Sequence, residues 1–313
     1  MRFQIALAVT LVIGFAACGG GTANDQPAEK PESIDKLVIY TVNYPLAYFA
    51  ERIGGDLVEV HFPAPGDGDP AFWSPDADTI AAYQAADLIL LNGAGYAKWV
   101  DRASLPSSRV VNTSGGFTDN LVPIEGTVTH SHGPEGEHEH GDLAFTTWLD
   151  PELAIHQAQA IEAAISVIRP ENEPEIQKRM EKLKSELIDI DSRLAAAAEN
   201  LGDEPLLFSH PVYRYLIKRY GLNGVEVHWE PDQVPDGYAW EHLEEVLGTH
   251  AAKWMVWEGE PLESTVEGLA KRDISSVVFN PCGNRPSEGD YLSVMAGNAV
   301  ALEGLDVATN SSP

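Results

Sequence analysis

The sequence contains very little cysteine: Cys18 and Cys282 are the only two in 313 residues. A chain that is exported and has no cysteine pair to spare has no disulfide framework, so its domains must be stable through their hydrophobic cores. With 44% hydrophobic residues, the chain is long enough to build two domains of ordinary size.

Basic residues are also scarce. The chain has 20 Lys and Arg against 48 Asp and Glu, which gives a formal net charge of −28. A surface this acidic repels the phosphates of nucleic acid, so we expect no nucleic-acid partner. It suits a soluble protein that encounters cations.

Long hydrophobic runs are missing after the N-terminal segment. Residues 5–17 form an apolar run that is too short for a comfortable membrane span and is typical of a secretory signal. The run ends in FAAC, which resembles a bacterial lipobox, although its phenylalanine is a looser match and leaves plain secretion open. We predict a lipoprotein signal peptide at residues 1–18 with lipidation at Cys18, followed by a flexible tether at residues 19–33. The expected location is the periplasmic side of a bacterial membrane, with the protein held by its lipid anchor.

Short β-rich runs alternate with helical patterns in both halves of the chain. The runs lie at residues 37–42, 58–62, 88–91 and 109–111, and then at 206–208, 225–229, 254–257 and 277–279. The helical patterns lie at residues 46–53, 76–86, 213–220, 239–249 and 262–271. This alternation predicts an α/β fold with two lobes, each containing a parallel sheet.

A long amphipathic segment separates the two halves. Its apolar residues recur at spacings of four and three, from Ile176 to Leu201, after Pro174 and before a capping Gly202. We predict one long helix at residues 171–202 that spans an N-terminal lobe (34–170) and a C-terminal lobe (203–313). The alternative is a coiled-coil seam between two copies, but we favour the spanning helix and a monomer. Lobes joined by one stiff helix should undergo only small movements when a ligand binds.

Parallel sheets of this kind bind ligands beyond the carboxyl ends of their strands. We therefore expect a ligand cleft between the two lobes, lined by the residues that follow each strand. In the second half of the chain these include Ser209-His210, His228-Trp229-Glu230 and Glu258.

Several segments resemble the zinc/manganese substrate-binding proteins of ABC importers, the family of the high-affinity zinc-uptake binding proteins. They are YPLAYFAERIGGDLVEV, AADLILLNGAGYAKWVD, WLDPELA, HPVYRYLIKRYGL, FNPCGN and YLSVMAGN, and a His-rich acidic loop stands just before WLDP. The resemblance implies two α/β lobes joined by a long helix. It also implies capture of Zn²⁺, Mn²⁺ or another divalent cation in the cleft, and delivery to a permease and its ATPase.

The family pattern implies three histidines and one carboxylate around the metal. Only His210 is kept, because Ala71, Thr146 and Asn280 occupy the other three positions. Alanine offers no ligand, and neutral hydroxyl and amide oxygens are poor ligands for zinc.

Two explanations for this loss are open. In the first, the site is rebuilt from His210, Glu258 and His228, with Glu230 also nearby in the sequence. In the second, the cleft binds a small molecule or a metal chelate between aromatic walls. The aromatic residues expected near the cleft are Tyr44, Trp73, Trp148 and Trp240.

The His-rich loop at residues 129–142 reads THSHGPEGEHEHGD and contains His130, His132, His138 and His140. Its glycines and proline predict irregular structure, and we expect it to act as an accessory site that binds divalent metal weakly. A solvated linker without a role and a tethered zinc buffer are the alternatives. The chain has no nucleophile elbow, phosphate loop or HExxH motif, so we expect no enzyme activity.

Overall fold

The structure is a computed structural model that describes residues 35–66, 68–124, 129–131, 137–139 and 143–305. The predicted signal peptide, tether and lipidation site at Cys18 lie outside these residues, as do His132 and His140. The described residues form one compact unit. Among the described residues, no helix has both the length and the apolar character needed to cross a bilayer.

The first sheet is parallel and has the strand order β2-β1-β3-β4. Its strands are short apolar runs: β1 (Leu37–Thr41), β2 (Val58–His61), β3 (Leu88–Leu91) and β4 (Val110–Asn112). Helix α1 (Tyr44–Gly54) follows β1 at once, because the Asn43 side chain accepts the Leu46 amide and Pro45 occupies the first turn. Helix α2 (Ala77–Ala85) is capped in the same way by Asp76.

The second sheet repeats this connectivity, with the parallel order β10-β9-β7-β8. Its strands are β7 (Leu206–Phe208), β8 (Gly224–Glu226), β9 (Trp254–Trp257) and β10 (Ser275–Val278). The helices between them are α5 (Arg214–Tyr220), α6 (Gly237–Leu247) and α7 (Glu263–Ala270). The two parallel sheets expected from the sequence are thus confirmed.

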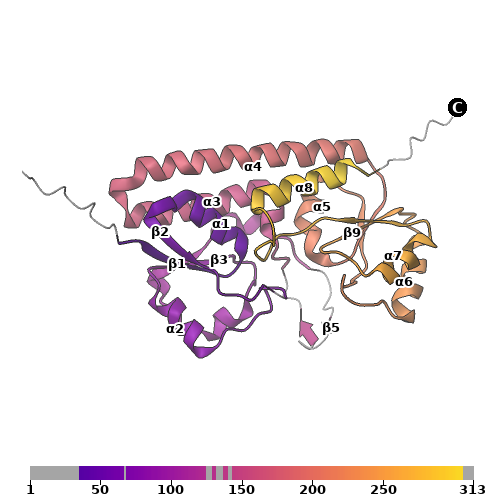
Figure 1. Ribbon diagram of the computed structural model, residues 1–313, viewed down its shortest axis with the longest axis horizontal. Coiled ribbons are helices and arrows are strands. Elements are labelled where there is room, and N and C mark those ends of the chain that lie inside the picture. Colours follow the sequence, from indigo (N-terminus) through magenta and orange to yellow (C-terminus); the bar gives the residue numbers. More distant parts are fainter. Residues whose placement is uncertain (1–34, 67, 125–128, 132–136, 140–142, 306–313) are drawn as a thin grey trace, which may run out of the picture. The chain divides into compact units, whose positions relative to one another are not determined.

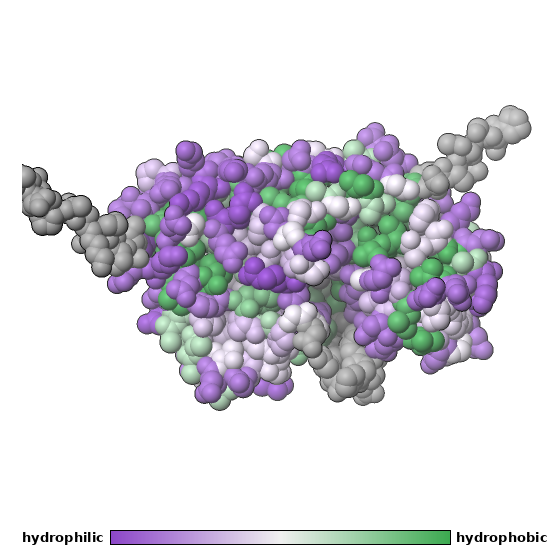
Figure 2. Space-filling model, in the orientation of Figure 1, coloured by the Kyte–Doolittle hydropathy of each residue, from purple (hydrophilic) through white to green (hydrophobic). Residues whose placement is uncertain are grey.

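Helix α4 (Glu173–Leu201) is the predicted long helix; its 29 residues extend about 43 Å. It ends at Gly202, whose φ of 58° costs glycine little. It packs against α1, α5, α3 (Pro151–Ile168) and α8 (Tyr291–Glu303), and Figure 1 shows it lying along these helices. Its apolar stripe is buried within the same chain, and the surface over it is mainly hydrophilic (Figure 2). The heptad-like spacing is therefore explained without a second copy.

Helices α3 and α8 were not predicted. Both pack on α4, so α8, the last described helix, lies beside α4 rather than on the second sheet alone. The remaining helical segments are single 3₁₀ turns or slightly longer: Gly55–Leu57, Lys98–Arg102, Ser107–Arg109, Gly115–Asn120, Thr147–Leu149, Pro170–Asn172 and Pro211–Tyr213.

The His-rich loop was expected to be irregular, and this is partly wrong. Strands β5 (Thr129–Ser131) and β6 (Glu137–Glu139) form an antiparallel pair in which His130 is the register partner of His138. Polar residues can pair as strands through backbone hydrogen bonds alone. The glycines and proline of the loop give no indication of such pairing.

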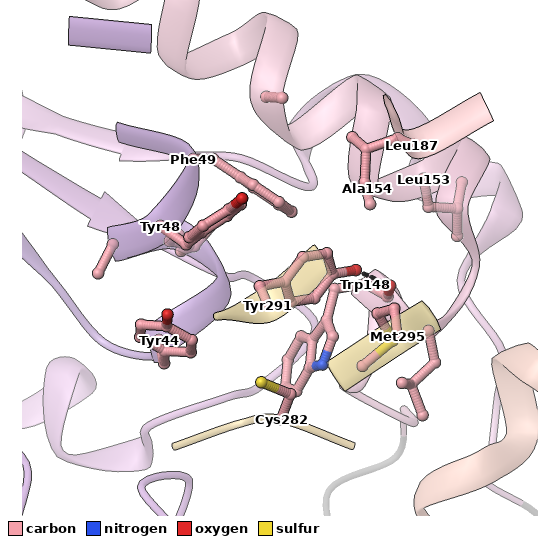
Figure 3. Close-up of a cluster of buried hydrophobic side chains, with 14 of the residues drawn as sticks. Tyr44, Tyr48, Phe49, Trp148, Leu153, Ala154, Leu187, Cys282, Tyr291 and Met295 are labelled. Carbon is pink, nitrogen blue, oxygen red and sulfur yellow. Dashed lines mark hydrogen bonds between the residues drawn. The ribbon is translucent and has the colours of Figure 1, made fainter. Parts of the chain in front are cut away.

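The chain after β10 returns to the first lobe. The Tyr44 amide donates to the Gly283 carbonyl at 3.0 Å, and Trp148 Nε1 donates to the Pro281 carbonyl at 2.7 Å. Tyr291, at the start of α8, donates its hydroxyl to the Trp148 carbonyl at 2.8 Å and packs edge-on against Phe49 (Figure 3). The lobes are therefore joined by this segment as well as by α4.

Neighbouring residues of α4 provide a test of this packing. Leu187 is fully buried, whereas Ile188 is 48% exposed. We expect Leu187→Ala to lower the free energy of unfolding by about 2–5 kcal/mol, since it leaves a cavity between helices. Ile188→Ala should change it by about 0.5 kcal/mol or less. Urea unfolding followed by circular dichroism measures both, and equal effects would contradict the assigned buried face.

Candidate metal centre

The strand order positions two side chains at one point of the second lobe. Strands β7 and β9 are neighbours, although β8 lies between them in sequence, so the chain connections leave this pair in opposite directions. A crevice forms at such a switch point, beyond the carboxyl ends of the strands. His210 follows the end of β7 by two residues, and Glu258 follows the end of β9 by one.

Glu230, in the loop after β8, completes a cluster with these two residues. His210 Nε2 lies 3.4 Å from Glu230 Oε1, and His210 Nδ1 lies 3.8 Å from Glu258 Oε1. One donor atom from each of the three residues lies within 4.8 Å of the others. The His210 side chain is 6% exposed and the two glutamates are 20% and 21% exposed, so the cluster is largely shielded from water.

The electrostatics of the cluster favour a cation. Burial raises the pKa of Glu258 well above its usual range, and the negative charge of Glu230 raises it further, with smaller effects from Asp69 and Asp232. A divalent cation at this point would offset both the repulsion and the desolvation of the carboxylates.

The cluster lies in the wall of a cavity of about 580 Å³. The cavity is lined from both lobes, with Asp69, Tyr96 and Phe145 on the first and the cluster on the second. None of the described residues that line it is Lys or Arg. The expected cleft between the lobes is therefore present, and its charged lining is acidic.

His228 was expected as the third ligand, but the third donor within reach belongs to Glu230. The His228 ring packs edge-on against His210, with 6.2 Å between ring centroids. Its backbone has a φ of 59°, which turns the chain sharply after β8. A role for His228 as a ligand stays a prediction.

The three substituted family positions have structural contacts, and the hydrogen bond of Thr146 joins the two lobes. Thr146 donates its hydroxyl to the Val212 carbonyl at 2.5 Å, and Asn280 Oδ1 accepts the Cys282 amide at 2.7 Å. Ala71 is buried, and its amide donates to Asp69 Oδ1 at 2.8 Å. These residues give a cation no strong ligand.

The aromatic wall differs from the expected one. Of the four aromatic residues expected near the cleft, Trp148 lines the cavity, together with Phe72, Tyr96 and Phe145. Trp240 instead packs on Trp229 and under Arg272. The expectation missed Tyr96, which lies in the loop after β3, and Phe145, which comes just before the 3₁₀ turn at Thr147–Leu149.

The first lobe carries asparagines at the positions equivalent to His210 and Glu258. Asn43 follows β1 by two residues and Asn92 follows β3 by one, as His210 and Glu258 follow β7 and β9. Asn43 Nδ2 donates to Asn92 Oδ1 at 3.1 Å, and Gln157 donates to the same oxygen at 3.1 Å. The crevice of the first sheet is thus filled by amides, and the ligand-binding chemistry of the strand ends belongs to the second lobe.

Two α/β lobes of the same connectivity, a long helix packed along both and a cleft whose side chains could hold a metal ion define a two-lobe solute-binding protein. The family model described as zinc-uptake complex component A, periplasmic, matches residues 39–304, and the chain belongs to this family.

Known relatives agree with this assignment. The chain is 30% identical over 302 residues to the high-affinity zinc uptake system protein ZnuA of Bacillus subtilis, covering 87% of this chain and 89% of the relative. It is 28% identical over 251 residues to the manganese ABC transporter substrate-binding lipoprotein PsaA of Streptococcus pneumoniae, covering 78% of this chain and 73% of PsaA. It is 25% identical to the zinc-binding lipoprotein AdcA of Streptococcus pneumoniae over 86% of this chain, but spans only 55% of AdcA.

Solved structures show the same fold. The metal-dependent lipoprotein YcdH of Bacillus subtilis aligns with a TM-score of 0.73 at 25% identity, covering 86% of this chain and 98% of that one. The Zn(II)-bound ZnuA-like domain of Streptococcus pneumoniae AdcA aligns with a TM-score of 0.73 at 22% identity, and the alignment covers 86% of this chain and 98% of that one. The predicted family and fold class are confirmed.

Proposed function

We propose that this chain is the extracytoplasmic substrate-binding component of a metal ABC importer. It captures a divalent cation, zinc in the first place, in the cleft and delivers it to a permease driven by an ATPase. Membership of the zinc-uptake family supports this proposal. The observation that carries it is the cluster of His210, Glu230 and Glu258, whose donor atoms lie within 4.8 Å of one another in the wall of the cleft.

The donor set suits a cargo that is bound and then released. Imidazole nitrogen and carboxylate oxygen are ordinary zinc ligands, and three protein ligands leave a coordination position open. A set richer in oxygen than in nitrogen also accepts Mn²⁺, and the relative PsaA is named as a substrate-binding lipoprotein of a manganese ABC transporter. We therefore include Mn²⁺ as a second cargo.

The cellular setting is part of the proposal. The protein is anchored to the periplasmic side of a bacterial membrane by lipid at Cys18, acts as a monomer and performs no catalysis. Relatives named as lipoproteins and as transport components support this setting. The loop histidines His130, His132, His138 and His140 serve as an accessory site that binds divalent metal weakly.

A second function is favoured by one observation. The cavity of about 580 Å³ is much larger than a bare ion and has aromatic residues in its lining. Cavities of this size and composition hold small organic molecules. Capture of a metal chelate or of an organic molecule is therefore the alternative cargo.

Native mass spectrometry of protein purified without added metal tests the proposal. All four loop histidines are first replaced by serine, so that any retained metal reports the cleft. We expect this parent variant to bind one zinc ion. An added His210→Ala substitution should weaken zinc binding by about 100-fold or more. Loss of a residue that only hydrogen-bonds to a metal ligand lowers the metal affinity by roughly 10–100-fold, and loss of a ligand itself should have a larger effect.

Zinc binding that disappears with the loop histidines alone would contradict the proposal. A retained organic molecule without metal would favour the second function. His242→Ala is the matched control, because His242 is an exposed histidine of α6 that does not line the cavity.

A further inference from the structure

All three residues of the cluster come from the second lobe. His210, Glu230 and Glu258 follow β7, β8 and β9 in turn. A cation held by these residues alone would not connect the two lobes, and four ligands are usual for zinc. The first lobe lost its family ligands at Ala71 and Thr146, so another residue on that wall of the cleft is needed.

Asp69 is the first-lobe carboxylate in the cavity lining. The described residues that line the cavity include four carboxylates, and the other three, Glu230, Asp232 and Glu258, belong to the second lobe. Asp69 and His210 also line a second, smaller cavity next to the first. The negative charge of Asp69 contributes to the raised pKa of Glu258, after burial and the charge of Glu230. Asp69 therefore lies across the cleft from the cluster, within range of its charges.

The loop that carries Asp69 is held in place. Asn284 Nδ2 donates to the Pro65 carbonyl at 2.6 Å and to the Gly68 carbonyl at 3.3 Å. Asp69 Oδ1 accepts the Ala71 amide at 2.8 Å, which fixes the orientation of the side chain. A carboxylate has about four acceptor sites on its two oxygens, so a carboxylate that accepts a backbone amide can also bind a cation.

Tyr96 provides an independent observation on the same wall. Its ring is clamped between Phe145 and Trp148, with centroid distances of 5.2 and 5.8 Å, and it lines the cavity. The side chain is 7% exposed, yet its hydroxyl has no hydrogen-bond partner among the described residues. A buried hydroxyl without a hydrogen-bond partner destabilises the protein, so a ligand or a rearranged carboxylate that accepts a hydrogen bond from it would be stabilised.

We propose that Asp69 is the ligand through which the first lobe closes on the cation, with the Tyr96 hydroxyl donating a hydrogen bond to the Asp69 carboxylate in the bound state. This inference rests on the proposed function. The cation is then shared by one imidazole and three carboxylates, and it bridges the lobes, so that opening of the cleft removes one ligand and releases the cargo. The substitution of the family ligand at Ala71 is thereby offset by the residue two positions before it.

The test compares two acidic residues in the variant that lacks the loop histidines. Asp69→Asn removes the charge but keeps the oxygen that accepts the Ala71 amide, so the loop should stay folded. Asp232→Asn removes an equal charge from another exposed carboxylate in the lining. Zinc affinity is measured by competition with a chromophoric chelator. We expect Asp69→Asn to weaken binding by about 10-fold or more and Asp232→Asn by about threefold or less.

Hydrogen exchange distinguishes direct binding of the cation by Asp69 from an effect of its negative charge at a distance. Zinc should protect the backbone amides of residues 69–73 in the parent and in Asp232→Asn, but not in Asp69→Asn. Tyr96→Phe should weaken zinc binding by less than Asp69→Asn and should leave some protection.

The outcomes are distinct. The role of Asp69 would be overturned if Asp69→Asn and Asp232→Asn bound zinc with equal affinity, or if zinc still protected residues 69–73 in Asp69→Asn. The proposed function would still be supported in that case, provided that zinc binding depends on His210. A parent variant that binds no zinc would overturn both.

Discussion

Replacing Glu230 and Glu258 together with glutamine is expected to abolish high-affinity metal binding and, at the same time, to stabilise the metal-free protein. The variant keeps His210 and the shape of the cluster but loses both of its carboxylates. Loss of one outer-shell partner of a metal site already costs roughly 10–100-fold in affinity, so loss of two ligands should exceed about 1,000-fold.

The gain in stability follows from the pKa of Glu258. Burial and the charge of Glu230 raise this pKa in the folded protein above its value in the unfolded chain. Between the two values the folded state binds more protons, so the stability of the metal-free parent falls as the pH rises from about 4.5 through the raised pKa. Glutamine does not titrate, so the double variant should lack this decline and melt higher at neutral pH.

Two measurements check this result. Chelator competition gives the zinc affinity, and thermal unfolding in excess chelator between pH 4.5 and 8 gives the stability profile. Glu260→Gln is the matched control, because Glu260 is exposed and does not line the cavity. Parental zinc affinity in the double variant, or a lower melting temperature in chelator at neutral pH, would contradict the assigned site.

This trade between stability and binding is expected of a binding site. Carboxylates that lie close together repel each other, and a bound cation would replace this repulsion by attraction to both. The same reasoning explains why the cleft has no basic residue among its described lining residues, since an Arg or Lys would neutralise the acids permanently and compete with the cation.

The alternation of strands and helices was enough to predict the fold. The runs 88–91, 206–208 and 254–257 coincide with β3, β7 and β9, and the buried face of α4 is the predicted stripe. Short apolar runs in parallel sheets are buried on both faces and are therefore recognisable. Helices α3 and α8 escaped prediction because α8 is apolar around much of its surface and α3 has a weak polar face, so neither shows a clear amphipathic pattern.

The ligand cluster could be predicted only in part. His210 and Glu258 were found because each directly follows a strand end, where the backbone stays close to extended. His228 was named as the third ligand, with Glu230 only noted as nearby in the sequence. Strand β8 ends at Glu226, and the positive φ at His228 breaks the alternation of side chains, which brings Glu230 toward His210. A left-handed backbone at a non-glycine residue has no sequence pattern of its own.

Trp148→Ala is expected to be among the most destabilising single substitutions, lowering the free energy of unfolding by about 3–5 kcal/mol. Trp148 is 2% exposed and lies between Tyr96 and the segment that returns from β10 to the first lobe. Its Nε1 donates to the Pro281 carbonyl, and its own carbonyl accepts the Tyr291 hydroxyl, so it joins the two lobes by packing and by hydrogen bonds (Figure 3).

Trp148→Phe separates these contributions. It keeps an aromatic ring against Tyr96 but leaves the Pro281 carbonyl without its donor, which should cost about 1–3 kcal/mol from the lost hydrogen bond, less than the alanine substitution. Urea unfolding gives both values. Trp148 also lines the cavity, so the alanine variant should bind zinc more weakly even at temperatures where it stays folded. The reason is that the two walls that carry Asp69 and His210 would no longer be held at a fixed separation. An alanine variant as stable as the phenylalanine variant, with parental zinc affinity, would contradict this role of Trp148 in joining the lobes.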